Sequence, residues 1–411
     1  MTALRERVPR EPAKRLLTGR VEAEAYVASI CFKHGPPGLL GTELEWTVHH
    51  AKDPTLPIDP DHLAAALGPH CPPTLHRDGR NVPLPAGSPV TVEPGGQVEI
   101  SAPPRRAPAE LIDSVLADQQ YLSGLLADAG LVLGDAGLDP YRSPRRILHT
   151  PRYAAMERAF APLGEHGITM MGATAGLQVC VDAGTPASAP LRWAAASALG
   201  PPLVAAFATS PVGAGGATGW ASARMRAVLG TDPARTLPLP HDADPVAAWV
   251  RRVLDTRVLC IRGPGDNWDA PAGLTFADWV AGGGPRPPTV DDLDYHISTQ
   301  FPPVRPRGYL EIRYLDAQPG TRWTVPLAVL AAVFGDDRVT EAALEACLPV
   351  ADQWYRAAER GLADDGIARA AATVLDLAVR ALPALGLTPA WNAAITADLH
   401  RIHARTQRRD S

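Results

Sequence analysis

The sequence predicts an α+β fold in which a mainly antiparallel sheet carries helices on one side. Strand-like segments dominate the stretches that carry acidic and arginine motifs, whereas residues 324–411 are rich in Ala and Leu and predict helices. Strands and helices do not alternate in the regular βαβ order that a parallel sheet requires. The sequence contains no P-loop motif and no strand-linked G-x-G-x-x-G, so any bound nucleotide must be held by other residues.

Short strands and helices are expected in the first half of the chain, between loops rich in proline. The clearest helix covers residues 108–130, where Leu111, Val115 and Leu122 recur at helical spacing before a glycine. In chain order, we expect a loosely held tail (1–18), a helix (21–34), a strand (39–48), loops (53–60, 69–88), a strand interrupted by Pro-Gly-Gly (91–101), the clear helix, a strand (131–133), a helix (151–160) and a buried strand (169–182).

The second half of the chain becomes mainly helical after a breaker rich in glycine and proline at residues 282–288. The C-terminal helices have breaks near Gly335 and Gly361 and between Pro383 and Pro389. In chain order, we expect helices (187–209, 219–229), a Pro-rich loop (232–242), a strand (258–261), a short helix (276–280), two strands (296–301, 308–314) and the C-terminal helices (from 324).

Composition limits the classes of protein to which the chain can belong. Its 411 residues are 46% hydrophobic and 20% charged, which is enough for a large core. The net charge of −5, without a basic stripe, argues against a nucleic-acid partner. Five cysteines lack C-x-x-C spacing, which favours reduced thiols, and we see no signal peptide or membrane-spanning segment. We therefore expect a cytoplasmic protein with no membrane partner.

Acidic side chains occupy one face of several predicted strands. In residues 41–46 the twofold period of a strand puts Glu43 and Glu45 on one face and Leu44 and Trp46 on the other. The same period gives polar side chains a common face on further predicted strands. These side chains are Gln97 and Glu99, Gln178, and Tyr309, Glu311 and Arg313.

Two interpretations of these polar faces are open. An antiparallel sheet commonly has one face in water, and such a face is polar. A solvated face would contain more Lys, Thr and Ser, whereas nearly all of these positions are Glu, Gln or Arg. Crowded carboxylates supply the oxygen ligands that Mg²⁺ prefers, and a neighbouring arginine supplies a cation for a phosphoryl group. The second interpretation is therefore a magnesium and phosphate site.

Six motifs follow one another along the first 319 residues. They are GTELEW (41–46), EPGGQVEIS (93–101), PRYAAME (151–157), ATAGLQV (173–179), TFADWV (275–280) and HISTQFPPVRPRGYLEIRYLDAQP (296–319). Together they resemble the bacterial and plant-type glutamate–cysteine ligase family, most closely the branch that makes γ-glutamylcysteine for ergothioneine synthesis. The last motif is long enough to be highly specific.

The resemblance implies a single catalytic domain over residues 19–411, with a strand-rich core at about 38–320 and a helical region at about 321–408. The core would be a curved, mainly antiparallel sheet of the glutamine-synthetase catalytic type, flanked by helices. The chain would be an acid–amino-acid ligase that uses ATP and Mg²⁺. It would join the γ-carboxylate of L-glutamate to the amine of L-cysteine through a γ-glutamyl phosphate.

The resemblance also implies roles for the polar side chains. Glu311 and Arg313 would be catalytic, with Arg313 against the γ-phosphate of ATP, and Gln97 would support glutamate or a metal-bound water. Substrate carboxylates would pair with guanidinium groups, which bind them through two parallel hydrogen bonds. The candidates for this role are Arg224, Arg305 and Arg307, and the candidate Mg²⁺ ligands are Glu43, Glu45, Glu99, Glu311 and Gln178.

Several alternatives remain open at this point. A ligase of the same fold could accept another amine, and a non-catalytic amino-acid or nucleotide sensor could share the scaffold. A structural protein with a wet sheet face is a third possibility. We expect Asp316 to be structural and His296 to be a core histidine. The sequence leaves open the oligomeric state, the regulation by products and the choice between the ergothioneine and glutathione pathways.

Overall fold

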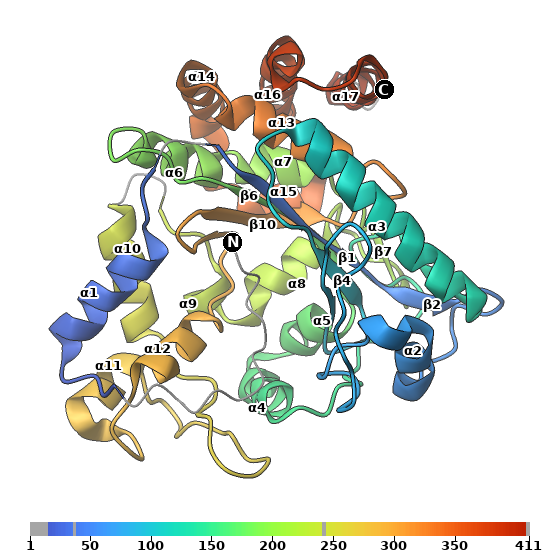
Figure 1. Ribbon diagram of the computed structural model, residues 1–411. Coiled ribbons are helices and arrows are strands. Elements are labelled where there is room, and N and C mark those ends of the chain that lie inside the picture. The colour runs from blue at the N-terminus through green and yellow to red at the C-terminus, as the bar shows by residue number, and fades with distance from the viewer. Residues whose placement is uncertain (1–14, 36–37, 241–243, 408–411) are drawn as a thin grey trace.

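An open sheet runs through the middle of the molecule in a computed structural model, which describes residues 15–35, 38–240 and 244–407 (Figure 1). Among these residues six strands form the sheet, and every pairing between neighbours is antiparallel. The antiparallel sheet expected from the sequence is therefore confirmed. In sheet order the strands are β3 (Val90–Val92), β4 (Val98–Ser101), β1 (Leu40–Trp46), β6 (Gly176–Val181), β10 (Leu310–Asp316) and β9 (Val304–Pro306).

The twofold period of the strands divides the sheet into an apolar face and a polar face. Leu44 and Trp46 of β1, Leu177 of β6 and Ile312 of β10 are at most 3% exposed and belong to the main hydrophobic core. The acidic, amide and arginine side chains predicted to share the other face alternate with these residues along the same strands. Burial of the apolar face is what fixes this register, because a slip by one residue would exchange the two faces.

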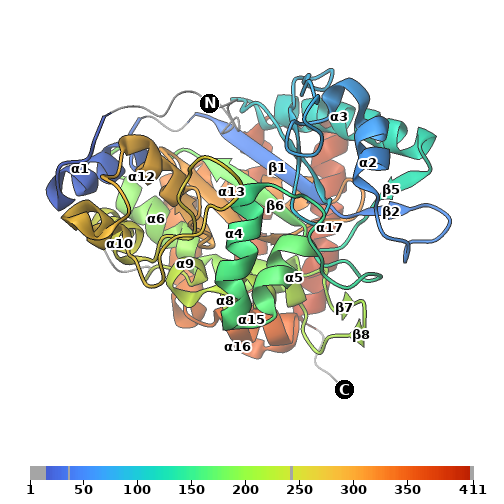
Figure 2. The same ribbon diagram turned by 90° about the horizontal axis from the view of Figure 1, so that it is seen from below.

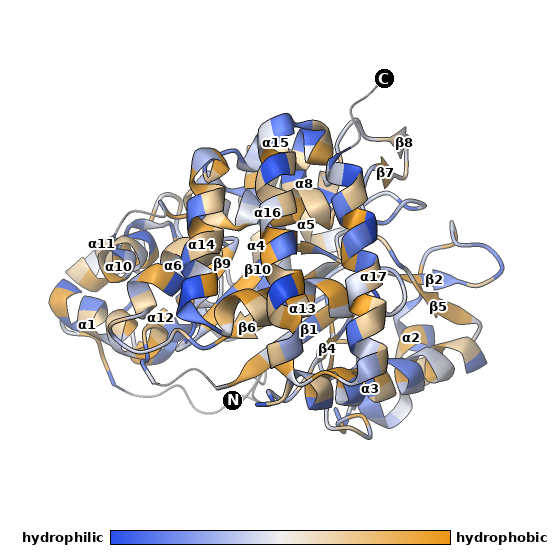
Figure 3. Cartoon of the chain, turned by 90° about the horizontal axis from the view of Figure 1, so that it is seen from above, coloured by the Kyte–Doolittle hydropathy of each residue, from blue (hydrophilic) through white to orange (hydrophobic). Residues whose placement is uncertain are grey.

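Helices cover the apolar face of the sheet. α6 (Ala189–Ala198) and α7 (Gly200–Ala206) contact β10, and α13 (Thr324–Phe334) contacts β6. Every residue of α13 is buried, as expected for a helix that is apolar on all sides. Figure 3 shows the remaining C-terminal helices as an outer layer over this face. They are α14 (Asp337–Cys347), α15 (Trp354–Arg360), α16 (Asp365–Ala381) and α17 (Pro389–Thr406).

A second group of helices lies opposite the polar face (Figure 2). The sheet thus has helices on both sides, which differs from the one-sided arrangement expected from the sequence. A small separate core, which includes Trp249, Phe276 and Trp279, packs the outer helices of this group together. The group consists of α4 (Pro151–Phe160), α5 (His166–Gly172), α8 (Ala223–Thr231) and α12 (Val290–Ile297), with α1 (Arg20–Cys31), α10 (Pro245–Asp255) and α11 (Phe276–Asp278) beside them.

The remaining elements are the long helix α3 and several short helices and strands. β2 pairs with β5 in a two-stranded sheet, and β7 pairs with β8. Within the described ranges, no helix has the length and apolarity to cross a membrane. These remaining elements are α2 (Pro60–Leu67), α3 (Pro108–Asp128), α9 (Pro233–Thr236), β2 (Val48–His50), β5 (Leu131–Leu133), β7 (Val212–Gly213) and β8 (Gly216–Ala217).

Two predicted strands are wrong. Residues 296–301 include the last turn of α12 and the turn after it, because a capping box between Thr289 and Asp292 starts a helix upstream. Residues 258–261 form no strand and make one isolated bridge instead, between Cys260 and Asp269. No neighbouring extended segment supplies these residues with a continuous partner in the part of the chain that the structure describes.

Three other expectations change in detail. Residues 169–172 belong to α5 and not to the strand that follows. Residues 91–101 form a hairpin of two strands, because the Pro-Gly-Gly segment makes a turn with Gly96 at φ 90°. Residues 15–18 are anchored, since Leu17 is buried and its N–H donates to the Pro288 carbonyl. The rest of the expected tail, residues 1–14, lies outside the described residues.

Candidate active site

A cavity of about 1710 Å³ lies against the polar face of the sheet. Its walls come from the strands on one side and from α4, α5, α8 and α12 on the other. The volume exceeds the roughly 300–1,000 Å³ of an ordinary ligand pocket, so it has room for more than one small molecule. All but one of the residues predicted for the site line this cavity. They are Glu43, Glu45, Gln97, Glu99, Gln178, Arg224, Arg305, Arg307 and Arg313.

Three glutamates from two neighbouring strands form the acidic part of the wall. Glu45 of β1 lies directly opposite Glu99 of β4, and the carboxyl groups of Glu43 and Glu99 share a hydrogen bond. Burial, and then the charges of Glu99 and Glu311, raise the pKa of Glu43 well above its usual range. Burial and the charges of Glu93 and Glu45 raise the pKa of Glu99 to about 8. The raised pKa values follow from burial and from the mutual repulsion of neighbouring carboxylates.

The acidic wall has the donor chemistry of a divalent-cation site. Carboxylate oxygens are the preferred ligands of Mg²⁺. A bound cation would favour the ionised forms of Glu43 and Glu99. Within the described residues no three acidic, histidine or cysteine side chains already form a metal cage. Glu43, Glu45 and Glu99 are the residues that would hold such a cation.

Glu311 is the predicted site residue that does not line the cavity. It is fully buried beneath the wall, and its carboxylate accepts hydrogen bonds from Arg305 Nε (2.5 Å) and Nη2 (3.1 Å). Arg313 Nη1 lies 3.2 Å and Arg307 Nη1 3.8 Å from the same carboxylate. Burial opposes ionisation of Glu311, but the charges of these arginines hold its pKa well below the usual range. In this arrangement Glu311 anchors three arginines.

The side-chain amide of Gln178 connects an acidic residue to a basic one. Its Nε2 donates to Glu45 Oε1 (2.9 Å), and its Oε1 accepts a hydrogen bond from Arg313 Nη1. Glu45 Oε2 also accepts from the Gly176 main-chain N–H (2.7 Å). Both ends of the amide are therefore used, and the oxygen that could bind a metal already faces a guanidinium group.

Gln97 lies at the turn of the β3–β4 hairpin, and its amide is also fully used. Its Oε1 accepts from the Gly95 N–H (3.0 Å), and its Nε2 donates to the carbonyl oxygens of Thr174 (2.8 Å) and Met171 (3.4 Å). A Cβ atom on Gly95 would lie 2.2 Å from the Gly172 carbonyl oxygen, so the turn packs directly on the end of α5. Gln97 fixes the hairpin to α5 in this structure.

Arg224 and Arg152 are two cations of the cavity wall that donate no hydrogen bond to a carboxylate among the described residues. Arg224 is buried on α8, and its Nε has no hydrogen-bond partner among the described residues. Arg152 on α4 donates to the Ser298 hydroxyl (3.1 Å) and stacks on the ring of Tyr295, with no acidic group within 4 Å in the described ranges. Arg262 lies over the same Tyr295 ring.

Sequence reasoning did not single out Arg152 or Tyr295 as site residues. Arg152 belongs to the quoted motif PRYAAME, and that was the available signal. The apolar part of the wall was also missed, because Met156, Met170 and Met225 lie on three different helices. His296 was correctly expected to be a core residue. It is buried, its Nε2 lies 2.7 Å from the Val253 carbonyl oxygen, and burial lowers its pKa to about 3.

These features define a class of protein: an α+β protein whose open antiparallel sheet presents carboxylates and guanidinium groups to one large cavity. Residues 39–394 match the family described as Glutamate-cysteine ligase family 2 (GCS2). The chain belongs to this family, as the resemblance implied, and is a ligase.

Relatives with similar sequences include glutamate–cysteine ligase EgtA of Mycolicibacterium smegmatis, which is 39% identical over 378 residues and covers 89% of this chain and 86% of that protein. EgtA of Mycobacterium tuberculosis is 38% identical, with 89% and 84% covered. The chloroplastic glutamate–cysteine ligase of Medicago truncatula is 29% identical over 274 residues, which are 64% of this chain and 53% of that protein.

The fold is shared with solved structures of low sequence identity. Glutamate–cysteine ligase of Francisella tularensis, solved in complex with AMP, is 14% identical with a TM-score of 0.51, covering 92% of this chain and 84% of that one. A bifunctional glutathione synthetase of Pasteurella multocida is also 14% identical with a TM-score of 0.51, covering 94% and 51%. The expected fold class, an antiparallel ligase sheet flanked by helices with a helical C-terminal region, is confirmed.

Proposed function

We propose that this protein joins the γ-carboxylate of L-glutamate to the amine of L-cysteine, with ATP and Mg²⁺, to give γ-glutamylcysteine for ergothioneine biosynthesis. The observation that carries the proposal is one cavity that Glu43, Glu45 and Glu99 line together with Arg313 and Arg224. The names of the EgtA relatives, which align over most of both chains, support the choice of substrates.

The reaction begins with attack of the glutamate γ-carboxylate on the γ-phosphorus of ATP, which releases ADP. Arg313 is suited to stabilise the transferring phosphoryl group, because Gln178 and Glu311 hold its guanidinium in place beside the acidic wall. The product of this step is a γ-glutamyl phosphate. Preorganised charge of this kind costs no rearrangement at the moment of reaction.

Glu43, Glu45 and Glu99 would hold the Mg²⁺ ions. When bound, Mg²⁺ neutralises the phosphate charges and orients the phosphoryl group. We place Glu311 in a different role from the one first expected for it. Both of its oxygens are paired with Arg305, so direct metal binding would require release of a buried ion pair. Glu311 would instead hold Arg305, Arg307 and Arg313 at the edge of the cavity.

Arg224 and Arg152 are the preferred groups for the carboxylates of glutamate, because neither guanidinium donates a hydrogen bond to a carboxylate among the described residues. The nearest carboxylate oxygen to Arg224, that of Asp316, lies 4.0 Å from Nη1. Arg305 and Arg307, which the sequence also proposed, point to Glu311. Cysteine would then attack the acyl carbon through its free amine, and inorganic phosphate would leave. Positioning of the three substrates supplies much of the rate, so no covalent enzyme intermediate is needed.

The test is an ADP-release assay with purified protein, MgATP, L-glutamate and a panel of amines. We expect release that depends on both glutamate and cysteine and that stops when Mg²⁺ is chelated. Release with another amine in place of cysteine would keep the ligase mechanism and replace the acceptor. ATP binding without turnover under any of these conditions would favour the alternative that the protein is a non-catalytic amino-acid or nucleotide sensor.

A further inference from the structure

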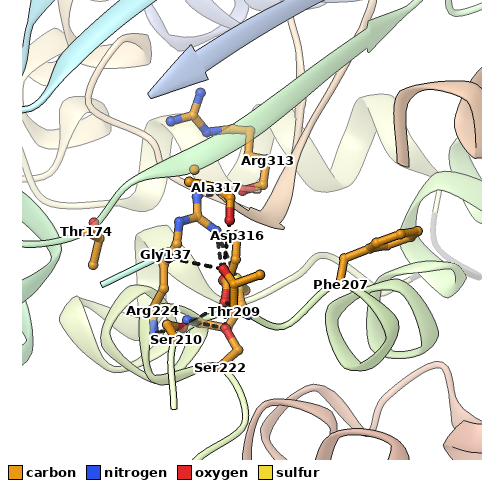
Figure 4. Close-up of polar contacts among 12 residues, drawn as sticks. Gly137, Thr174, Phe207, Thr209, Ser210, Ser222, Arg224, Arg313, Asp316 and Ala317 are labelled. Atoms are coloured by element: carbon orange, nitrogen blue, oxygen red, sulfur yellow. Dashed lines mark hydrogen bonds and ion pairs between the residues drawn. The ribbon is translucent and has the colours of Figure 1, made fainter. Parts of the chain in front are cut away.

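A buried polar network around Asp316 joins the end of β10 to the start of α8 (Figure 4). Oδ2 of Asp316 accepts hydrogen bonds from the Thr209 main-chain N–H (2.9 Å) and from Ser210 Oγ (2.7 Å). Oδ1 accepts one from Ser222 Oγ (2.8 Å). Asp316 is 2% exposed and does not line the cavity. One buried carboxylate therefore ties two loops to the strand that carries Arg313.

The two serines extend this connection to α8. Ser222 is the N-cap of the helix, and its Oγ accepts the main-chain N–H of Met225 (3.1 Å). Ser210 Oγ accepts the main-chain N–H of Arg224 (3.1 Å). The first N–H groups of a helix have no partner within it, so the groups that cap them determine where the helix starts. Asp316 thereby fixes the first turn of α8, from which Arg224 projects.

The side chain of Arg224 is held close to β10 and β6. Its Nη2 donates to the main-chain oxygen of Arg313 (2.9 Å), and its Nη1 lies 4.0 Å from Asp316 Oδ1. A Cβ atom at Gly176 would lie 2.3 Å from Nη2, so this position leaves no room for a larger residue. Arg224 is 6% exposed and lines the cavity, and its Nε is the polar atom left without a partner among the described residues.

Gly137 closes the other side of the network. A Cβ atom there would lie 2.6 Å from the Asp316 carboxyl carbon, and its N–H donates to Thr209 Oγ1 (3.1 Å). Thr209 Oγ1 in turn donates to the Ala317 carbonyl (2.7 Å). Backbone therefore surrounds the carboxylate, which has little freedom to move. A buried charge with three hydrogen bonds and such close packing defines one geometry.

We propose that Asp316 is a positioning residue that sets the place of Arg224 relative to Arg313, a role that rests on the proposed function of the cavity. Arg313 and Asp316 lie on one strand, whereas Arg224 comes from a helix that the Asp316 network holds against this strand. The glutamate-binding guanidinium and the phosphoryl-stabilising guanidinium are thus fixed to one another. Their separation matters because a misplacement of about 1 Å in such a site can cost a factor of about a hundred.

Asp316→Asn is the central variant, since the amide keeps the shape but offers one acceptor oxygen instead of two. We expect the KM for L-glutamate to rise about tenfold or more, from misplacement of Arg224. The KM for MgATP should stay within about twofold, because Arg313 is still held by Gln178 and Glu311.

A double-mutant cycle separates positioning from general loss of structure. Arg224→Ala alone should raise the KM for glutamate about a hundredfold, and Asp316→Asn should add less than about twofold in that background. Effects that multiply in the double mutant would overturn the proposal, because Asp316 would then not act through Arg224. A KM for glutamate within twofold of the unmodified protein in Asp316→Asn would overturn it as well.

Asp118→Asn is the matched control. Asp118 is also fully buried and accepts the main-chain N–H groups of Ala86 (2.7 Å) and Ser88 (2.9 Å), but it does not line the cavity. The Asp118→Asn variant should be less stable than the unmodified protein and should keep its kinetic constants. If Asp316→Asn does not fold, Ser210→Ala and Ser222→Ala each remove two hydrogen bonds, one to Asp316 and one from a main-chain N–H in the first turn of α8. Each should raise the KM for glutamate about two- to fivefold. If the effects of both serine variants on the KM for glutamate multiply with the effect of Arg224→Ala, the proposal is overturned.

Calorimetric titration with L-glutamate tests the positioning role of Asp316 separately from the proposed function. If the unmodified protein binds glutamate and Asp316→Asn binds it with equal affinity, the positioning role is overturned and the proposed function stays intact. Neither binding nor ADP release by the unmodified protein would overturn the proposed function and this inference together. Weaker binding in Asp316→Asn, with normal binding in Asp118→Asn, is the result we expect.

Discussion

Glu311 has the most consequential surroundings of any single residue in the site. Three arginines lie within 4 Å of its buried carboxylate, and Arg305 contacts both of its oxygens. Removing one partner of a buried ion pair leaves the other charges without compensation. The charge of Glu311 is therefore coupled to the position of Arg313 even if Glu311 never touches a substrate.

Glu311→Gln should reduce kcat by a factor of about a thousand and destabilise the fold by roughly 3–5 kcal/mol, because the buried guanidinium of Arg305 and the partly buried ones of Arg307 and Arg313 lose their anion. Steady-state kinetics and urea unfolding measure the two effects. Asp364→Asn is the control, since Asp364 is a buried carboxylate paired with Arg356 outside the cavity, and its kcat should not change. Full activity of Glu311→Gln would contradict the anchoring role.

Gln178→Met keeps the length of the side chain and removes both hydrogen bonds of the amide. We expect kcat to fall about 10- to 100-fold, because Arg313 loses an acceptor that orients it. The apparent Mg²⁺ constant should rise by less than about tenfold, because Glu45 loses the amide donor but keeps the hydrogen bond from the Gly176 N–H, whereas loss of a direct ligand would raise it by about tenfold or more.

Gln119→Met provides the comparison for Gln178→Met. The amide of Gln119 is also used at both ends, by the Trp323 indole N–H (2.8 Å) and the Gly320 carbonyl (3.0 Å), but it lies outside the cavity. Its kcat should equal that of the unmodified protein. A tenfold rise of the apparent Mg²⁺ constant in Gln178→Met alone would return Gln178 to the set of metal ligands.

The residues of the polar face could be chosen from the sequence because a strand has a strict twofold period. Glu43, Glu45, Glu99 and Gln178 were placed correctly on the cavity side in this way. Their hydrogen-bond partners could not be predicted. The contact of Gln178 with Arg313 joins residues 135 positions apart in the sequence, and periodicity carries no information about it.

The elements that position the site differ in how clearly the sequence specifies them. α3 and α4 begin with proline after an extended residue, which is a local signal, and their bounds agree closely with the expected ranges. Residues 296–301 looked like a strand because apolar residues occur among polar ones. The helix start that overrides this pattern lies in the capping box of Thr289 and Asp292, outside the segment itself.

The loop that follows β5 gives a pH-dependent prediction at the scale of an element. Asp139 in this loop binds the Arg142 guanidinium (2.7 Å), and Arg142 Nη2 donates to the Val48 carbonyl (2.7 Å) of β2. Burial opposes ionisation of Asp139, but the His49 ring nitrogen 3.5 Å away, a hydrogen bond from the Tyr141 N–H and the charge of Arg142 lower its pKa from 3.8 to about 2.

A carboxyl group whose pKa is lower in the folded state stabilises the fold above its unfolded pKa and loses this effect as pH falls through its folded pKa. For Asp139 the loss occurs between about pH 4 and pH 2 and amounts to roughly 1–2 kcal/mol after allowance for solvent screening. Asp139→Asn should therefore show a smaller fall in the free energy of unfolding over this interval. Equal falls in the two proteins, measured by urea unfolding, would contradict the assignment.

At the scale of the whole molecule, the sheet separates two tasks. Its apolar face packs on α6, α7 and α13 and supplies most of the core, while its polar face forms one wall of the cavity. The sequence predicted the antiparallel sheet and the C-terminal helices. It also predicted α4 and α8 as helices and Arg224 of α8 as a site residue. It did not predict that α4, α5, α8 and α12 lie over the polar face, because their other cavity-lining residues are mostly apolar or single arginines and look like ordinary core or surface positions.

Helices α4, α5, α8 and α12 enclose the polar face of the sheet, and this enclosure makes the face suitable as a reaction site. Buried charges act more strongly on one another in the lower dielectric of the protein interior. Burial is accordingly the largest cause of the raised pKa values of Glu43 and Glu99. The central claim is that this wall and Arg313 together activate the γ-carboxylate of glutamate at the expense of ATP.

The most direct test follows ADP formation by the unmodified protein with MgATP, L-glutamate and L-cysteine, and omits each component in turn. The account predicts ADP release that requires glutamate, cysteine and Mg²⁺, with γ-glutamylcysteine formed in equal amount. It also predicts loss of this release in Arg313→Ala. Equal rates of ADP release with and without glutamate, or full activity of Arg313→Ala, would contradict it.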